Sequence, residues 1–497
     1  MAGTFWAVVP TLIAVVFALI TKEVFVSLFL GIVAGAMFIA NGNPIEAFDA
    51  LFNVMANKMG ADVIADGDGT KIVGLGNAGI LIFILELGIL VALMNKSGGT
   101  TSFGSLVMSK IKSRKGALLA TTSLGSFIFM DDYFNRLAVG TVMRPVTDKY
   151  NISRTRLAYI IGSVSVSICI LVPISSWAGA ITGNISEGIG EGYDAFGLYL
   201  RTLLCNFYPI LTLLFLFIGS AFDLVPFGMR KFAYTPSGEA PTCTPYVNEK
   251  GKPFDLLLPI LVLIALSIVL MLVSPYSSET SLVLSGAFTI IFCLLLYLPR
   301  KVLSLKDFTD CFTDGFKSVV DVMIILVFAW TLTGVCERLD VASFIRGLTS
   351  DMGSAQSLLP AILFVVSMGT AFATGTAWGT FGLIVPLTVP MFDAFSTLQI
   401  LSIAAVLSGS VFGNQVSPIS DSTLLASNVC ECEHITFIKA QLPGALLIAA
   451  IAFCSFLISG ISQLIWLGWV VAAVMFVTLL IFTARKNKKA AAATKSN

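Results

Sequence analysis

Charged side chains are scarce in this sequence. Only 12% of the 497 residues are Asp, Glu, Lys or Arg, against about 25% in a typical soluble domain. Hydrophobic residues make up 56%, the mean hydropathy is +0.92, and long apolar runs recur from end to end. This composition excludes an ordinary soluble protein and predicts an all-α polytopic membrane protein embedded in a lipid bilayer. The net charge of +1 argues against a nucleic-acid partner.

The sequence also lacks the motifs of the common enzyme classes. It contains no P-loop, no HExxH and no GxSxG. Its nine cysteines include no CxxC pair and lie mostly in apolar runs, where they are expected to be buried small hydrophobes. The longest polar segments, about 30 residues, are too short for the soluble domain of an ATP-driven pump. We therefore expect a protein that is not an enzyme and that needs no cofactor beyond coupling ions.

Eleven apolar runs approach the length that crosses the hydrocarbon core of a bilayer, which is about 30 Å thick. They lie at about 5–20, 24–40, 74–94, 157–174, 198–222, 254–274, 280–298, 319–336, 399–413, 440–460 and 463–483. Two further regions, about 117–143 and 357–393, are apolar but interrupted by Gly, Ser and Thr and, in the first, by charges. The sequence thus predicts about 11 transmembrane helices and two hairpins.

The basic residues of the loops predict the orientation of the chain. Segments 95–116 and 144–156 are rich in Lys and Arg, so both should be cytoplasmic. The region between them must then enter and leave by one face, which makes 117–143 a re-entrant hairpin. Two thin spans joined by a short outer turn are the alternative. The same reasoning puts the acidic loops 41–73 and 183–197 and the N-terminus outside, and linker 223–253 and tail 484–497 inside.

The second half of the chain repeats the first. Pro145 corresponds to Pro386 at an offset of 241, and Val172-Pro-Ile-Ser-Ser176 corresponds to Ser417-Pro-Ile-Ser-Asp421 at an offset of 245. We therefore divide the chain into repeats 1–222 and 254–462, followed by an extra helix, 463–483. Five spans in each repeat invert the second copy, so hairpin 357–393 should enter from outside. The acidic loop 430–439, expected inside, does not fit this orientation.

Four polar breaks interrupt apolar runs and form two matched pairs. The hairpin breaks are 131–136 and 374–380, and the span breaks are 173–177 and 414–423. Unwound helices expose carbonyls and N–H groups, and hydroxyls and carboxylates are the ligands that hard cations prefer. The expected ion or substrate site comprises Asp131, Asp132, Asn135, Arg136, Ser175, Ser176, Thr374, Thr376, Asn414, Ser417, Ser420, Asp421 and Thr423.

Within this set, Asp131, Asp132 and Asp421 are the candidates for binding Na⁺. Adjacent residues on a helix diverge by about 100°, so one of Asp131 and Asp132 should face the site while the other pairs with an arginine. A helix cap is the alternative role for Asp421. Glu86, in the middle of a predicted span, is a candidate proton relay or a partner of a basic residue. His434, the one histidine, is expected to be a solvated loop residue rather than a pH sensor.

Asp131-Asp-Tyr-Phe-Asn135 and Pro173-Ile-Ser-Ser-Trp177 resemble motifs of the NhaC-type Na⁺/H⁺ antiporter family. Thr374-Gly-Thr-Ala-Trp-Gly-Thr380 and Ser417-Pro-Ile-Ser-Asp421 are similar to that family's second-half motifs, and the resemblance covers nearly the whole chain. It implies an ion-coupled secondary transporter in a bacterial-type plasma membrane. Arg136 departs from the family's small residue at this position.

Na⁺/H⁺ antiport by alternating access is accordingly the first functional hypothesis, with Na⁺ and H⁺ competing for one carboxylate. Na⁺- or H⁺-coupled transport of an amino acid or small organic carboxylate is the second, since the guanidinium of Arg136 suits a carboxylate. A channel or receptor is a third, against which the paired breaks argue. The sequence leaves a monomer and a homodimer equally open.

Overall fold

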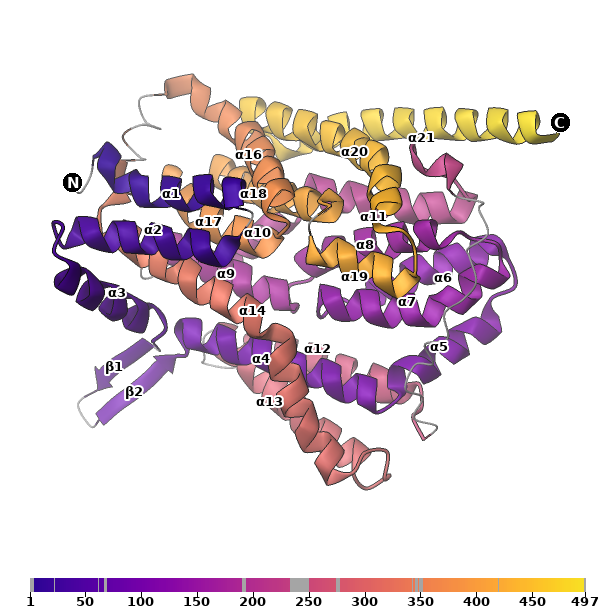
Figure 1. Ribbon diagram of the computed structural model, residues 1–497, viewed down its shortest axis with the longest axis horizontal. Coiled ribbons are helices and arrows are strands. Elements are labelled where there is room, and N and C mark those ends of the chain that lie inside the picture. The colour runs from indigo at the N-terminus through magenta and orange to yellow at the C-terminus, as the bar shows by residue number, and fades with distance from the viewer. Residues whose placement is uncertain are drawn as a thin grey trace.

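The structure is a computed structural model that describes residues 4–21, 23–60, 62–66, 69–189, 194–232, 250–273, 278–341, 343–344, 347, 352–418 and 420–495. Helices dominate it, as the composition predicted, and most of them run roughly along the long axis of the molecule (Figure 1). Of the linker 223–253, which the sequence predicts to be cytoplasmic, the structure describes 223–232 and 250–253; positions 233–249 lie outside the described residues.

The first half contains eleven helices and a small sheet among its described residues. The helices are α1 (Phe5–Thr21), α2 (Val24–Ile39), α3 (Pro44–Lys58), α4 (Gly76–Lys96), α5 (Gly99–Lys110), α6 (Arg114–Phe127), α7 (Asp132–Lys149), α8 (Arg154–Leu171), α9 (Ser176–Ile189), α10 (Ala195–Leu203) and α11 (Phe207–Phe222). Strands β1 (Asp62–Asp66) and β2 (Gly69–Gly74) pair antiparallel.

The second half follows a similar order. Its helices are α12 (Phe254–Val273), α13 (Ser278–Tyr297), α14 (Leu305–Arg338), α16 (Leu359–Thr374), α17 (Ala377–Thr388), α18 (Thr397–Val416), α19 (Asp421–Cys430), α20 (His434–Ser462) and α21 (Ile465–Lys495). Short 3₁₀ turns are η1 (Met229–Lys231), η2 (Gly353–Leu358) and η3 (Val389–Met391).

Eight described helices are long and apolar enough to cross a membrane, or up to ten if the bent pairs α2–α3 and α10–α11 each count as one span. The chain is therefore a multi-pass helical membrane protein. The predicted count of 11 is not confirmed. Helices α1 and α12 contain only shorter apolar stretches, which lowers the count. Helix α16, expected as half of a hairpin, adds to the count, because together with η2 it forms a run of 22 residues, Gly353–Thr374.

Both hairpins and both broken spans form helix–break–helix units, although the first hairpin break lies earlier than predicted. Of its predicted residues 131–136, only Asp131 lies in the break, and 132–136 belong to the start of α7. Residues 128–131 separate α6 from α7, and Gly375 with Thr376 separates α16 from α17. Gly375 has φ +74°, a left-handed conformation that glycine adopts readily, so it ends α16 and turns the chain. In the spans, residues 172–175 and 417–420 separate α8 from α9 and α18 from α19. The re-entrant course of each hairpin stays a prediction.

The loop 41–73 differs from the expected irregular segment. Asn43 caps α3 by accepting a hydrogen bond from the N–H of Ile45, and Pro44 occupies the first helical position. One face of α3 buries Ala47, Ala50 and Val54, and the helix turns 117° from α2. The sequence did not predict α3, because the helix is short and contains both polar and apolar residues.

Helices α4 and α14 cross at contact distance because each has a glycine there. A Cβ on Gly88 would lie 2.6 Å from the carbonyl oxygen of Gly315, and a Cβ on Gly315 would lie 2.5 Å from the amide nitrogen of Ile89. Such approaches are possible only without a side chain, and van der Waals packing of this kind drives helix association in membranes. The crossing joins the two halves of the chain.

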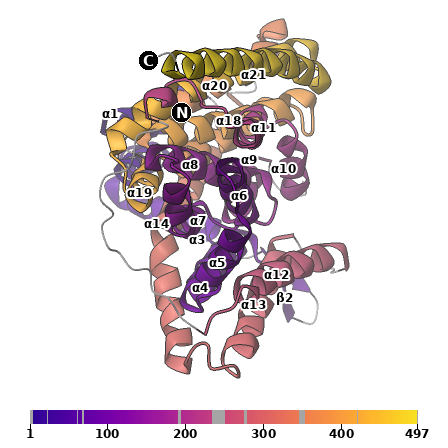
Figure 2. The ribbon, with the colours of Figure 1, turned by 90° about the vertical axis from the view of Figure 1, so that its right-hand side faces the viewer.

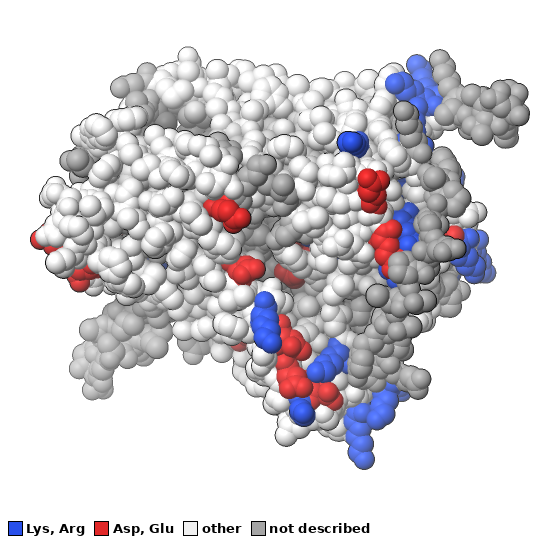
Figure 3. Space-filling view, viewed as in Figure 1, with Lys and Arg blue, Asp and Glu red and all other residues white. Residues whose placement is uncertain are grey.

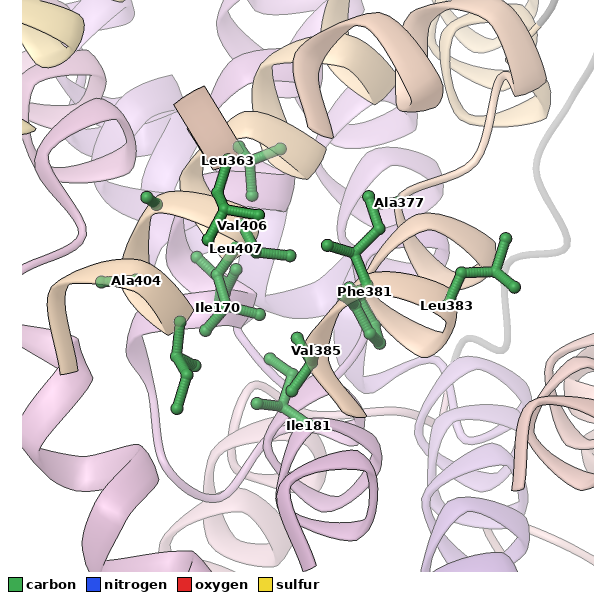
Figure 4. Packing of buried hydrophobic residues seen from close by; sticks show 14 of the residues in the cluster. Ile170, Ile181, Leu363, Ala377, Phe381, Leu383, Val385, Ala404, Val406 and Leu407 are labelled. Atoms are coloured by element: carbon green, nitrogen blue, oxygen red, sulfur yellow. The ribbon is translucent and has the colours of Figure 1, made fainter. Parts of the chain in front are cut away.

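The core brings the breaks of both halves together. Figure 4 shows part of this core: side chains of α8, α16 and α18 lie together on one side, side chains of α17 lie on the other, and Ile181 of α9 lies next to Val385 of α17. Helix α17 packs on α9, and reciprocally α7 packs on α19, so each hairpin contacts the broken span of the other half. Figures 1 and 2 place α4, α12 and α13 on one side of this core and α20 and α21 on the other.

Candidate functional site

The first hairpin break is closed by Asn135. Its amide nitrogen donates hydrogen bonds to the carbonyl oxygens of Gly125, at 2.5 Å, and Ile128. Gly125 lies in the last turn of α6 and Ile128 directly follows the helix, at the end where C=O groups have no partner within the helix. Asn135 therefore holds the hairpin shut, while its own side-chain oxygen is buried without a partner among the described residues.

Asp132 is fully buried and surrounded by donors. Its Oδ2 accepts from Nη1 of Arg136 at 2.6 Å, one helical turn along α7, and from Oγ of Ser422 at 3.4 Å. Its Oδ1 accepts from Nε1 of Trp177 at 3.1 Å. Arg136 is equally buried, so the two charges neutralise each other away from water. Among the two adjacent aspartates, Asp132 is the one that pairs with an arginine.

Asp131 has a different environment. Its Oδ1 accepts a hydrogen bond from the N–H of Phe134 at 2.9 Å and so caps α7. Its Oδ2 lies 3.4 Å from the hydroxyl of Ser176, and no described ion pair joins it to a basic residue. The carboxylate also lines a cavity of about 600 Å³.

This cavity lies between α4 and α14 on one side and α7, α9 and α19 on the other. The polar and aromatic residues that line it are Asp131, Ser176, Tyr133, Phe134, Lys96 and Asp314. The other described lining residues are Ile84, Leu87, Gly88, Val91, Ala92, Asn95, Leu137, Ser318, Val319 and Leu425. Most of the wall is thus apolar, as is usual for small-molecule sites.

All four predicted breaks meet around Asp132. Ser176 N–H in the first broken span donates to the carbonyl of Met130 in the first hairpin at 2.9 Å. The ring of Trp177 packs on Trp378 of the second hairpin, with centroids 5.5 Å apart. Ser422 brings in the second broken span. Residues more than 240 positions apart in the sequence therefore share one buried polar cluster.

The hydroxyls of the first broken span differ in their roles. Ser175 Oγ donates to the carbonyl of Cys169 at 2.5 Å and accepts from the N–H of Ala178 at 3.2 Å. It therefore satisfies the backbone at the break rather than facing the cavity. Ser176 faces Asp131 and lines the cavity.

In the second broken span the predicted side chains bond mainly to each other. Ser420 Oγ donates to Oδ1 of Asn414 at 2.7 Å, and Thr423 Oγ1 donates to the carbonyls of Ser417 and Ser420, both at 2.8 Å. Ser417 Oγ reaches the carbonyl of Phe372 near the second hairpin, at 2.7 Å. Asp421 begins α19, and its side chain lies outside the described residues.

The hydroxyls of the second hairpin are also engaged locally. Thr374 Oγ1 donates to the carbonyl of Thr370 at 2.8 Å, and Thr376 caps α17 by accepting from the N–H of Gly379 at 3.3 Å. Neither makes a described hydrogen bond to an aspartate. Among the described residues, no group of three or more His, Cys, Asp or Glu side chains is arranged to hold a metal ion. The Na⁺ ligand role of Asp131, Asp132 and Asp421 stays a prediction.

Comparison with known proteins adds the family. The profile of the Na⁺/H⁺ antiporter family matches residues 168–461. An uncharacterized protein of Haemophilus influenzae is 31% identical over 98% of this chain and 96% of its own length. The chain belongs to the Na⁺/H⁺ antiporter family.

Two further similarities agree with this membership. The malate-2H⁺/Na⁺-lactate antiporter of Bacillus subtilis is 29% identical over 38% of this chain and 41% of its own length. The YdaH transporter of Alcanivorax borkumensis has a similar fold, with a TM-score of 0.55 at 12% identity, covering 88% of this chain and 98% of that chain. This family member is an ion-coupled membrane transporter.

The position of Glu86 in this antiporter-family chain separates it from the aspartates. It is buried on α4, but it does not line the cavity, and its Oε2 has no hydrogen-bond partner among the described residues. Gly286 of α13 lies against its carboxylate. No described basic residue pairs with it, so the paired alternative is not borne out, and a proton relay role stays a prediction.

His434 was expected to be solvated, and the structure corrects this. The ring lies half-buried at the start of α20, with Nε2 2.8 Å from the carbonyl of Pro418 and Nδ1 3.0 Å from Oγ of Ser427. It therefore ties the second broken span to the next helix. No local pattern marked this role, because Pro418 lies 16 residues away.

The acidic loop that did not fit the predicted orientation has partners. Glu431 bonds Nη1 of Arg144 at 2.7 Å and Nη1 of Arg154 at 2.5 Å, both in the basic segment 144–156. In the same way Asp223 bonds Arg156 at 2.6 Å. Glu431 and the basic segment therefore lie at the same end of the molecule, and the orientation of that end in the membrane stays a prediction.

Proposed function

We propose that this transporter exchanges Na⁺ for H⁺ at the carboxylate of Asp131. The observation that carries the proposal is the contrast between the two adjacent aspartates. Asp132 is held by Arg136, Trp177 and Ser422, whereas Asp131 faces a cavity and has no described cationic partner. Na⁺ and H⁺ can compete for a carboxylate only if each of them can reach it and leave it again. The cavity beside Asp131 gives this carboxylate such access.

The proposed orientation places the cavity on the cytoplasmic side. Lys96, which lines it, belongs to the basic segment 95–116 that the positive-inside rule assigns to the cytoplasm. Figure 3 supports the assignment, because Lys and Arg gather toward the right and lower right of this face, whereas acidic side chains alone are visible near α2 and α3. The N-terminus is then external, and the C-terminus cytoplasmic, in a bacterial-type plasma membrane. We propose no cofactor besides the coupling ions and no catalytic residue.

Flux in proteoliposomes tests the proposal. Vesicles that hold a pH-sensitive dye are made acidic inside, and Na⁺ is then added outside. The wild type should dissipate the gradient, Asp131→Asn should lose the response, and Glu337→Gln on α14 should keep it. Asp132→Asn and Asp421→Asn are measured alongside. If Na⁺ never dissipates the gradient, Na⁺/H⁺ exchange is wrong; if Asp131→Asn exchanges at the wild-type rate, the assigned site is wrong.

An organic solute is the second candidate cargo, coupled to Na⁺ or H⁺. The cavity of about 600 Å³ is favourable to it, because small-molecule sites commonly span about 300–1,000 Å³ and a bare ion needs far less. The malate-2H⁺/Na⁺-lactate antiporter of Bacillus subtilis carries organic acids by its name. An amino acid or small organic carboxylate is therefore the comparison substrate in the experiments below.

A further inference from the structure

We propose that the cavity beside Asp131 binds an organic ammonium ion with an apolar body, rather than an organic carboxylate. This inference rests on the proposed function in that it takes the cavity as the transport site. Three features of the cavity carry it: the charge of the groups that face it, the position of Arg136, and the chemistry of its wall.

The first feature is the sign of the charge. Asp131 and Asp314 contribute two carboxylates, and Lys96 is the one basic side chain among the described lining residues. Lys96 Nζ lies 3.8 Å from Asp307 and 3.7 Å from Asp310, so acids outside the cavity offset its charge. Figure 3 shows acidic and basic side chains next to one another over the lower part of α14. A net negative cavity attracts cations and repels carboxylates.

The second feature is that the guanidinium of Arg136 is not available to a substrate. Its Nη1 is 2.6 Å from Asp132, its side chain is 1% exposed, and it does not line the cavity. Arg136 was the residue that favoured a carboxylate substrate from the sequence. Its pairing with Asp132 removes that argument, because a carboxylate in the cavity would meet Asp131 without a compensating arginine.

The third feature is the wall around Asp131. Tyr133 and Phe134 line the cavity next to the carboxylate, and aromatic faces attract ammonium groups. Ser176 Oγ offers a further polar atom 3.4 Å from Oδ2 of Asp131. Helices α4 and α14 contribute the apolar lining residues Ile84, Leu87, Val91 and Val319. An ammonium group would lie against Asp131 while a hydrocarbon or aryl body fills the apolar part.

Ligand-dependent thermal stability of the purified full chain in detergent tests this inference. The probes share one shape and differ in charge: 2-phenylethylamine, its permanently charged trimethylammonium form, 2-phenylethanol and 3-phenylpropanoate. Binding to the folded state raises the apparent stability by mass action. We expect both cations to stabilise the wild type and the alcohol and the carboxylate to leave it unchanged.

Three variants locate the effect. Asp131→Asn keeps a residue that caps helices well, so it should fold and bind the cations at least about tenfold more weakly, as expected for loss of a charged partner. Ala92→Phe fills the cavity and should weaken binding of the phenyl probes without removing a charge. Glu337→Gln removes a distant acid of α14 and should bind like the wild type.

The outcomes separate this inference from the proposed exchange. Stabilisation by 3-phenylpropanoate, stabilisation by the cations that survives in Asp131→Asn, or no response to any probe each overturns it. Normal Na⁺-driven H⁺ flux together with such a result leaves the exchange function standing. Conversely, if the wild type shows no Na⁺-driven H⁺ flux but binds the organic cations as expected, only the exchange proposal is overturned.

Discussion

Removing Arg136 should destabilise this protein far more than removing the charge of its neighbour Asp131. Arg136 and Asp132 form a buried pair 2.6 Å apart, and both side chains are 1% exposed. Breaking such a pair by removing one partner leaves an uncompensated buried charge and costs about 3–5 kcal/mol. Arg136→Met should therefore lower the free energy of unfolding by about that amount. Asp131→Asn keeps the cap of α7 and should change it by less than about 1 kcal/mol.

The measurement is equilibrium unfolding in mixed micelles titrated with SDS. Tryptophan fluorescence is a suitable signal, because Trp177 donates to Asp132 and should report loss of this cluster. The double variant Asp132→Asn/Arg136→Met removes both charges together. Its loss of unfolding free energy should be smaller, by about 2 kcal/mol, than the sum of the losses in the two single variants, since contacting residues couple.

Two results would refute this reasoning. Unfolding of Arg136→Met at the wild-type SDS concentration would show that the pair is hydrated or absent. Strict additivity in the double variant would show that the two charges do not interact. Either result would also reopen Arg136 as a ligand for a substrate carboxylate.

Two further predictions concern helix contacts outside the aspartate pair. Gly88→Ala places a Cβ 2.6 Å from the carbonyl oxygen of Gly315 and should lower the free energy of unfolding by about 1–3 kcal/mol. The control is Gly369→Ala, whose Cβ would meet open space. It should leave the free energy of unfolding unchanged or raise it in the same assay. His434→Ala removes two ring hydrogen bonds, to Pro418 and Ser427, and should lower the free energy of unfolding by about 1–3 kcal/mol; His434→Gln should recover part of it. An unchanged Gly88→Ala would contradict the close crossing, and an unchanged His434→Ala would contradict the tether.

Much of the architecture could be read from local features of the sequence. Long apolar runs mark spans because an unpaired backbone is excluded from the hydrocarbon core, and the structure places helices at these runs. Proline, glycine and polar residues mark breaks because they interrupt the helical hydrogen bonds. Three of the four observed breaks therefore overlap the predicted residues well, whereas the first hairpin break lies at 128–131 rather than at 131–136. Features without such a local signal, such as α3 and the tether of His434, were missed.

The sequence by itself determined that this is a helical membrane protein with two pairs of broken helices and a buried polar centre. For the two adjacent aspartates, it predicted that one would face the site and that the other would pair with an arginine, since a helix turns about 100° per residue. Only the tertiary structure decided which of them pairs with an arginine. The partners of Asp132 are Arg136 nearby, Trp177 45 positions away and Ser422 290 positions away, and no local pattern encodes the packing that joins them. Asp131 faces the cavity for the same reason: its walls come from helices of both halves.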